Sequence, residues 1–166
     1  MYVTDKGNNR VQVFSLTGAF ITTWGIQGIG ESKFRRPIGI DADQSKAYVV
    51  DAHNHQVQIF TTNGTYMAEC GGEGVGPGEF SAPLSVAVDD TRVFVVDTGN
   101  NRVQLFSVGG SFFMEWGTEG SGEGQFRSPT DIDVHGSTVY VVDEGNSRIQ
   151  MFSVGGQFLG SWSINR

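Results

Sequence analysis

The sequence is poor in several features that would define other classes of protein. It has a single cysteine, Cys70, so no disulfide can form within the chain and the fold does not depend on oxidation. No apolar run approaches the roughly 18 residues that a membrane-spanning helix needs. Basic residues number 11 against 18 acidic ones, and the net charge of −7 argues against a nucleic acid or an anionic membrane as the main partner.

Helical patterning is also missing. No stretch repeats apolar residues at i, i+3, i+4 and i+7 for longer than about one turn, so we predict essentially no α-helix. Glycine, by contrast, is abundant at 24 of 166 residues, and it gathers in turns rather than in one low-complexity tract. Short strands joined by glycine-rich turns are expected.

One unit of 46 residues is repeated along the whole chain. The motif Val-Val-Asp-Thr-Gly-Asn-Asn-Arg-Val-Gln-Leu-Phe (residues 95–106) has counterparts in the other periods, and no insertion or deletion interrupts the spacing. The positions that recur at this step are Asp5, Asp51, Asp97 and Asp143; Phe14, Phe60, Phe106 and Phe152; Phe34, Phe80 and Phe126; Pro37, Pro83 and Pro129; and Trp24, Cys70, Trp116 and Trp162.

Each period resolves into four short runs of strand type. In the third period these runs are residues 83–89, 92–97, 102–106 and 111–116, followed by a glycine-rich connection over 117–128. Four antiparallel strands per period of 40–50 residues are the signature of a β-propeller blade. We therefore predict an all-β fold and one propeller domain over residues 1–166, with a partial blade at 1–28 that lacks its innermost strand and blades at 29–74, 75–120 and 121–166.

Three coupled segments of the last period carry a family resemblance. The segments Gly-x-Gly-Gln-Phe-x-x-Pro (residues 122–129), Tyr-Val-Val-Asp-x-Gly-Asn-x-Arg-Ile-Gln-Met-Phe (residues 140–152) and Gly-x-Phe-Leu (residues 156–159) resemble the NHL repeat, and the resemblance covers the whole chain. It implies a propeller that in this family usually closes with six four-stranded antiparallel blades. Because this chain holds about four and Met1 enters the repeat within a strand, we expect an incomplete ring. Either self-association completes it, most simply as a homodimer, or the chain is a piece of a longer propeller.

Most of the repeated polar and aromatic residues are interpreted as scaffold. A scaffold needs the same residue in every unit, whereas a site needs different residues in one place. We therefore expect the aspartates of the Asp-x-x-Asn-x-Arg box to accept backbone N–H groups in the tight turn and to pair with arginine. The repeated Phe and Trp rings are expected to fill the spaces between neighbouring blades.

Candidate site residues are sought where one period departs from the others. The second period has Asp51-Ala52-His53-Asn54-His55-Gln56 where its counterparts keep Gly-Asn-x-Arg, and residues 32–36 form the one basic cluster. Alternation of strand direction puts both segments on the same face, so His53, His55, Arg35 and Arg36 are predicted to bind a ligand there. Two imidazoles at i and i+2 could also offer ligands to a divalent metal such as zinc.

A second candidate lies on the innermost strands. Asp41, Asp131 and Asp133 are expected to face the central channel, where carboxylates could hold a divalent cation such as calcium. A solvated channel mouth is the alternative interpretation.

The favoured function is a non-enzymatic binding module whose loop face contacts a protein or a small molecule. The alternative follows from the resemblance, since NHL-like propellers include a peptide-amidating lyase and six-bladed relatives include metal-dependent lactonases. That alternative would make Asp41, Asp131, Asp133 and His135 metal ligands or acid–base groups, but no nucleophile–base pair is evident and no catalytic residue is assigned. The loop face comprises residues 25–37, 51–56, 71–83, 97–102, 117–129 and 143–148.

Overall fold

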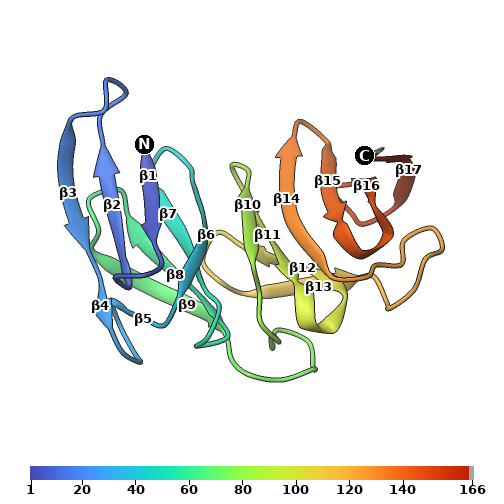
Figure 1. Cartoon of the computed structure of the whole chain (residues 1–166), viewed down its shortest axis with the longest axis horizontal. Helices are drawn as coiled ribbons and strands as arrows, with labels where there is room; N and C mark the ends of the chain where they lie inside the picture. Colours follow the sequence, from blue (N-terminus) through green and yellow to red (C-terminus); the bar gives the residue numbers. More distant parts are fainter. Residues whose placement is uncertain (165–166) are drawn as a thin grey trace.

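The computed structural model describes residues 1–164, which fold into a row of antiparallel sheets (Figure 1). One three-stranded sheet is followed by three four-stranded sheets, and in each the strands follow chain order from inside to outside. The first sheet, blade 1, contains β1 (Tyr2–Asp5), β2 (Arg10–Phe14) and β3 (Phe20–Trp24). Blade 2 contains β6 (Pro37–Ala42), β7 (Lys46–Asp51), β8 (Gln56–Thr61) and β9 (Tyr66–Gly71). Blade 3 contains β10 (Ser85–Val88), β11 (Arg92–Asp97), β12 (Arg102–Ser107) and β13 (Phe112–Trp116), and blade 4 contains β14 (Pro129–His135), β15 (Thr138–Asp143), β16 (Arg148–Ser153) and β17 (Phe158–Ser163).

The all-β propeller expected from the 46-residue period is confirmed, and so is the near absence of helix. The helical segments within residues 1–164 are two 3-10 turns, η1 (Thr98–Asn100) and η2 (Glu144–Asn146). No helix in this part of the chain is long and apolar enough to cross a membrane. The inner strand of blade 3 is shorter than the predicted 83–89, whereas the equivalent Pro37 and Pro129 begin the inner strands of blades 2 and 4.

The second strand of each complete blade is largely buried, and in blade 3 the third strand is buried to the same extent. All but the first residue of β7 and β11 are buried, in keeping with their continuous β-branched and aromatic sequence. The turn after each second strand needs a left-handed residue, which is Asn9, His55, Asn101 or Ser147, with φ between 51° and 54°. Short polar or imidazole side chains tolerate this conformation better than β-branched ones do.

The spaces between blades are filled by the repeated aromatic residues, as predicted. Phe34, Phe80 and Phe126 are fully buried, and each packs on the phenylalanine of the third strand, with ring centroids 5.8, 5.5 and 5.6 Å apart. Gly71 has a φ of 108°, and a Cβ there would lie 2.5 Å from the Phe80 ring. Because this phenylalanine ring leaves no room for a Cβ, a glycine is needed at the same position wherever a phenylalanine covers it.

The tryptophan positions join each blade to the next. The Trp24 ring lies 5.9 Å from Phe60 and the Trp116 ring 5.8 Å from Phe152, each in the following blade. Cys70 occupies the same position in blade 2 and is 7% exposed, within the cluster that contains Phe106. Burial, with a smaller contribution from the Glu69 charge, raises the pKa of the Cys70 thiol to about 12, so this cysteine is a packing residue and not a nucleophile at neutral pH.

The innermost strands β6, β10 and β14 lie side by side, with β1, the counterpart of the second strands, next to β6, and they form the concave side of the row (Figure 1). The glycine-rich loops that precede them lie at the opposite end from the turns that follow them. The first of these loops contains a short parallel pair, β4 (Ile26–Gln27) with β5 (Lys33–Phe34), and single parallel bridges Glu73–Phe80 and Glu119–Phe126 occupy the same place in the next two loops. This arrangement gives the row a loop face and, at its other end, a turn face made of residues 43–45, 89–91 and 136–137.

Candidate functional site

The repeated aspartate box is a structural device, as its strict repetition indicates. In blade 3, Asp97 is fully buried, and its Oδ1 accepts the Ser81 N–H at 2.7 Å. Asn100 Nδ2 donates to Asp97 Oδ2 at 2.8 Å and to the Gly74 carbonyl at 3.0 Å. The backbone N–H that the aspartate accepts comes from the preceding glycine-rich loop, and not from the tight turn as we expected. The box therefore holds that loop against the blade.

An arginine completes the box in blades 3 and 4. The Arg102 side chain is 7% exposed and its Nε lies 2.8 Å from Asp97 Oδ2. Its two Nη atoms donate to Glu115 and to three carbonyl groups of the loop, all at 2.8–2.9 Å. Arg148 repeats the contact to its own aspartate at 2.7 Å and the three contacts to loop carbonyls at 2.7–2.9 Å.

Blade 2 departs from this arrangement at Gln56. Asp51 is fully buried and accepts the Arg35 N–H at 2.8 Å and the Asn54 amide at 2.6 Å, but no arginine guanidinium within residues 1–164 pairs with it. Burial raises the pKa of Asp51 to about 6, against the smaller lowering effects of hydrogen bonds from the Arg35 N–H, Asn54 and Gln58 and of the Arg35 charge. Gln56 Nε2 is buried and finds no hydrogen-bond acceptor among the described residues. The sequence shows this substitution plainly, but our interpretation of the segment rested on its histidines.

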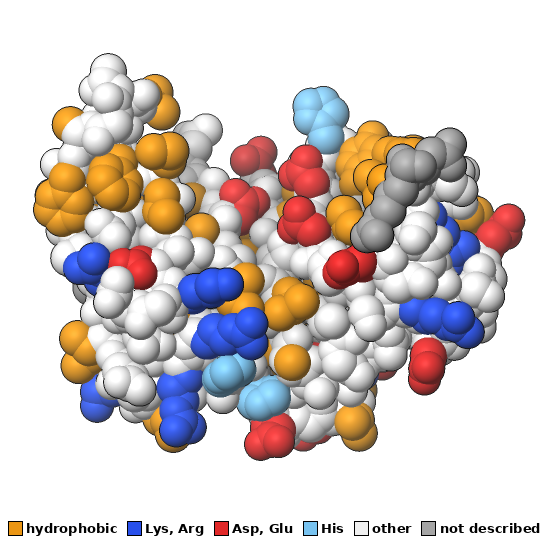
Figure 2. All heavy atoms as spheres, viewed as in Figure 1, with side chains coloured by type: hydrophobic (Ala, Val, Ile, Leu, Met, Phe, Trp, Pro, Cys, Tyr) orange, Lys and Arg blue, Asp and Glu red, His pale blue; other side chains and the backbone are white. Residues whose placement is uncertain are grey.

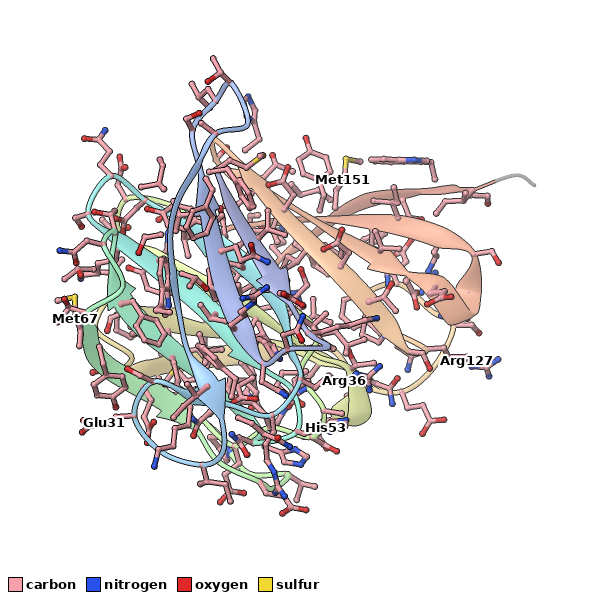
Figure 3. The ribbon with its side chains drawn as sticks, turned by 60° about the vertical axis from the view of Figure 1, so that its left-hand side comes forward. Glu31, Arg36, His53, Met67, Arg127 and Met151 are labelled. Atoms are coloured by element: carbon pink, nitrogen blue, oxygen red, sulfur yellow. The ribbon has the colours of Figure 1, made fainter. Side chains whose placement is uncertain are left out.

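The residues predicted to bind a ligand on the loop face do lie together. Arg36 Nη1 is 3.2 Å from His53 Nε2, and because a guanidinium only donates, the imidazole nitrogen accepts. The His53 N–H donates to the Arg35 carbonyl at 3.1 Å. Arg35, Arg36 and His53 are all exposed, and Figure 3 shows Arg36 and His53 next to each other at this end of the molecule.

His55 has a different role from His53. Its Nδ1 accepts the N–H of Ala82 at 3.1 Å and so joins blade 2 to the loop that enters blade 3. The asparagines at the same position make the same link, from Arg36 N–H to Asn9 Oδ1 and from Ser128 N–H to Asn101 Oδ1, both at 2.9 Å. The ring of His55 therefore replaces an asparagine amide as a connection between blades.

The three predicted channel aspartates are on the concave side, on strands β6 and β14. Asp41 accepts the N–H groups of Val88 and Ala42, each at 2.8 Å, while Asp131 accepts the Ser85 hydroxyl at 2.6 Å. Burial raises the pKa of Asp41. The two backbone hydrogen bonds oppose this effect, and the Asp133 and Asp43 charges make smaller contributions that also raise the pKa. Within residues 1–164, no group of three or more His, Cys, Asp or Glu side chains is placed to hold a metal ion.

Two grooves open on the turn face. One of about 410 Å³ is lined by Asp89, Asp90, Thr91, Arg92 and Gly136, and one of about 310 Å³ by Asp43, Gln44, Ser45 and Asp90. Asp43 and Asp89 accept hydrogen bonds from their own turns, so their carboxylates are partly used in holding these turns. We did not single out these turn residues from the sequence, although Asp43 and Asp89 are 46 residues apart.

Charged side chains are unevenly placed on the face shown in Figure 2. Acidic side chains gather around the upper part of the hollow between the two halves, with one His above them, and Lys, Arg and His side chains gather below with some acidic ones beside them. An anionic group is favoured beside the exposed Arg35, Arg36 and His53, whereas the rest of the loop face carries several exposed Glu side chains.

A family model described as a 6-bladed beta-propeller (DUF5128) matches residues 32–91 and 82–165. No curated protein matches the sequence. Among solved structures, a streptogramin B lyase is similar at 17% identity and a TM-score of 0.73, covering 99% of this chain and 51% of that one. A virginiamycin B lyase from Staphylococcus aureus is similar at 14% identity and a TM-score of 0.69, covering 98% of this chain and 51% of that one. A chain of a nidogen/laminin complex is similar at 14% identity and a TM-score of 0.71, covering 98% of this chain and 58% of that one.

These identities show a shared fold alone. The chain spans between half and three fifths of the length of the solved structures that it matches.

Proposed function

Because the chain belongs to the 6-bladed beta-propeller family, we propose that it is a non-enzymatic binding scaffold of the NHL type, whose loop face binds an acidic group of a protein or small-molecule ligand. Propeller folds support such a role, since rigid blades position loops of differing sequence. The observation that carries the proposal is the exposed contact between Arg36 and His53, beside Arg35, on a chain of net charge −7. A carboxylate or phosphate there would receive charge-assisted hydrogen bonds from the guanidinium groups.

A labelled hexaglutamate peptide tests this proposal by fluorescence anisotropy at low ionic strength. The double substitution Arg35→Ala with Arg36→Ala is expected to weaken binding by about tenfold, because two exposed guanidinium groups are lost. Added salt should weaken the wild-type interaction in the same direction. Arg127→Ala is the matched control, since Arg127 has the place of Arg35 in blade 4 and is also exposed, but has Gly145 in the place of His53. We expect its affinity to stay within about twofold of the wild type.

Equal loss of affinity in the double variant and the Arg127→Ala variant would contradict a specific site. Saturable binding of Ca²⁺ or Zn²⁺ that Asp41→Asn abolishes, together with cleavage of a lactone or ester, would instead favour the alternative of a metal-dependent lyase or lactonase. That reaction would take place at Asp41, Asp131 and Asp133 on the concave side.

Self-association to complete a ring is a further part of the proposal. Trp162 is 44% exposed on the last strand, whereas Trp24 and Trp116 pack on the following blade. We expect light scattering behind a sizing column to give twice the mass of one chain. Trp162→Glu should shift the species to a monomer, because the substitution places a charge on the contact surface. A wild type that is monomeric over a wide range of concentrations would contradict self-association, and this result would not bear on the loop-face site.

A further inference from the structure

Blades 3 and 4 each contain a complete set of acceptors for a guanidinium group. In blade 3 the set consists of the Asp97 and Glu115 carboxylates and the carbonyls of Val75, Gly76 and Glu79. In blade 4, Asp143 and the carbonyls of Ser121, Gly122 and Gln125 are used in the same way. The acceptors surround a planar group with several N–H donors, as arginine requires.

The 46-residue period places the same set in blade 2, which we call the blade 2 cradle. Its members are Asp51, Glu69 and the carbonyls of Ile29, Gly30 and Lys33. The loop that carries these carbonyls has the same closures as its counterparts. Gly28 N–H donates to Phe34 at 3.0 Å and Lys33 N–H to Gly30 at 3.0 Å, against 3.0 and 3.1 Å for Gly74 with Phe80 and Glu79 with Gly76. The loop therefore keeps these two closures although blade 2 has no arginine at position 56, but Gly30 has a φ of 99° whereas its counterparts Gly76 and Gly122 are not left-handed.

Gln56 reaches only part of the way into this cradle. Counted along the side chain, its Nε2 corresponds to the Nε of arginine, so nothing in glutamine corresponds to the two Nη atoms. The Nε2 atom is buried and has no acceptor among the described residues, and Asp51 has no arginine partner. Burial raises the pKa of Asp51 by more than its hydrogen bonds and the Arg35 charge lower it.

We propose that the blade 2 cradle is a receptor for a guanidinium group from outside the chain, presented by an arginine side chain of a partner or by a free guanidino compound. A spherical cation fits this set less well, because the equivalent acceptors in blade 3 are divided among three nitrogen atoms of one planar group. Access is from the outer edge of the loop face, where Glu69 is exposed and Ile29 is 67% exposed.

The receptor can be tested with small probes on the whole chain. We expect N-acetyl-arginine amide to shift the NMR signals of the Gln56 side-chain amide and of Glu69 saturably, with a dissociation constant in about the millimolar range. N-acetyl-citrulline amide has nearly the same shape but no charge, and should bind at least about tenfold more weakly. Free guanidinium ion is titrated at the same low concentration. Its affinity, compared with that of N-acetyl-arginine amide, shows whether the guanidinium group alone is enough or whether the peptide backbone of an arginine residue is also needed.

The control variant Gln56→Arg places a guanidinium group in the cradle from within. It should abolish binding of N-acetyl-arginine amide without loss of folding, and Glu69→Gln should weaken binding by at least about threefold. The proposal is overturned if Gln56→Arg binds the probe as well as the wild type does, or if the wild type gives no saturable shift. It stands apart from the acidic-ligand site, because Arg35→Ala with Arg36→Ala should leave this binding in place.

Discussion

Replacing Arg102 with glutamine is expected to lower the free energy of unfolding by about 3–5 kcal/mol, the range for breaking a buried ion pair by removing one partner. The Arg102 side chain is 7% exposed and contacts Asp97, Glu115 and three loop carbonyls at 2.8–2.9 Å. Loss of the guanidinium would leave Asp97, which is fully buried, without its cation. Urea unfolding followed by tryptophan fluorescence at neutral pH measures the change.

Arg10→Gln is the matched control for this prediction. Arg10 pairs with Asp5 at 2.8 Å, as Arg102 does with Asp97, but its side chain is 39% exposed and water screens the pair. We expect a much smaller loss of stability than for Arg102→Gln. Losses of similar size at the two positions would mean that burial of the pair is not what makes the blade 3 contact strong.

The reverse substitution, Gln56→Arg, is expected to stabilise the chain by about 1–3 kcal/mol at pH 7.5, the range for hydrogen bonds to a charged group. The new guanidinium would pair with Asp51 and with the loop carbonyls, as Arg102 does in blade 3. Few single substitutions in a native protein act in this direction by so much. The same urea titration measures it.

The pH dependence of this gain identifies its source. The pKa of Asp51 is raised from 3.8 to about 6 in the folded state, so the folded chain holds this proton more tightly than the unfolded chain does. Asp51 therefore costs the wild type stability as the pH rises from about 4 to about 6, by about 3 kcal/mol at most. Gln56→Arg removes this cost, so its advantage should be largest above pH 6 and small below about pH 4. An advantage that does not change with pH would place the gain elsewhere than at Asp51.

Much of the architecture follows from the sequence because the structural unit is short and repeated. A 46-residue step without insertions predicts a blade, and short alternating or β-branched runs between glycine-rich turns predict its four strands. The repetition of Phe34, Phe80 and Phe126 correctly indicated residues between blades, since any residue needed at every interface recurs at every step. The same reasoning placed Arg36 near His53, because strand direction alternates and puts both segments on the loop face.

Other features depended on contacts that no spacing reveals. His53 and His55 are two residues apart, yet one contacts Arg36 at the surface and the other accepts the Ala82 N–H as a link between blades. The origin of the backbone N–H bound by Asp97 was not predictable either, because Ser81 lies 16 residues earlier in the chain. Which polar group a side chain contacts depends on how the loops fold back over the blade.

By itself, then, the sequence determined the all-β propeller, the strand pattern and the position of the one blade that lacks its arginine. Local propensity and hydrophobic periodicity depend on residues that are close together in the sequence. Because the same short pattern recurs in every period, it can be recognised from the sequence alone. Only the tertiary structure decided that Asp51 is fully buried and that, within residues 1–164, no arginine guanidinium pairs with it. The physical reason is that desolvation and hydrogen-bond satisfaction are properties of the packed loops, and these bring together residues 16 to 27 positions apart.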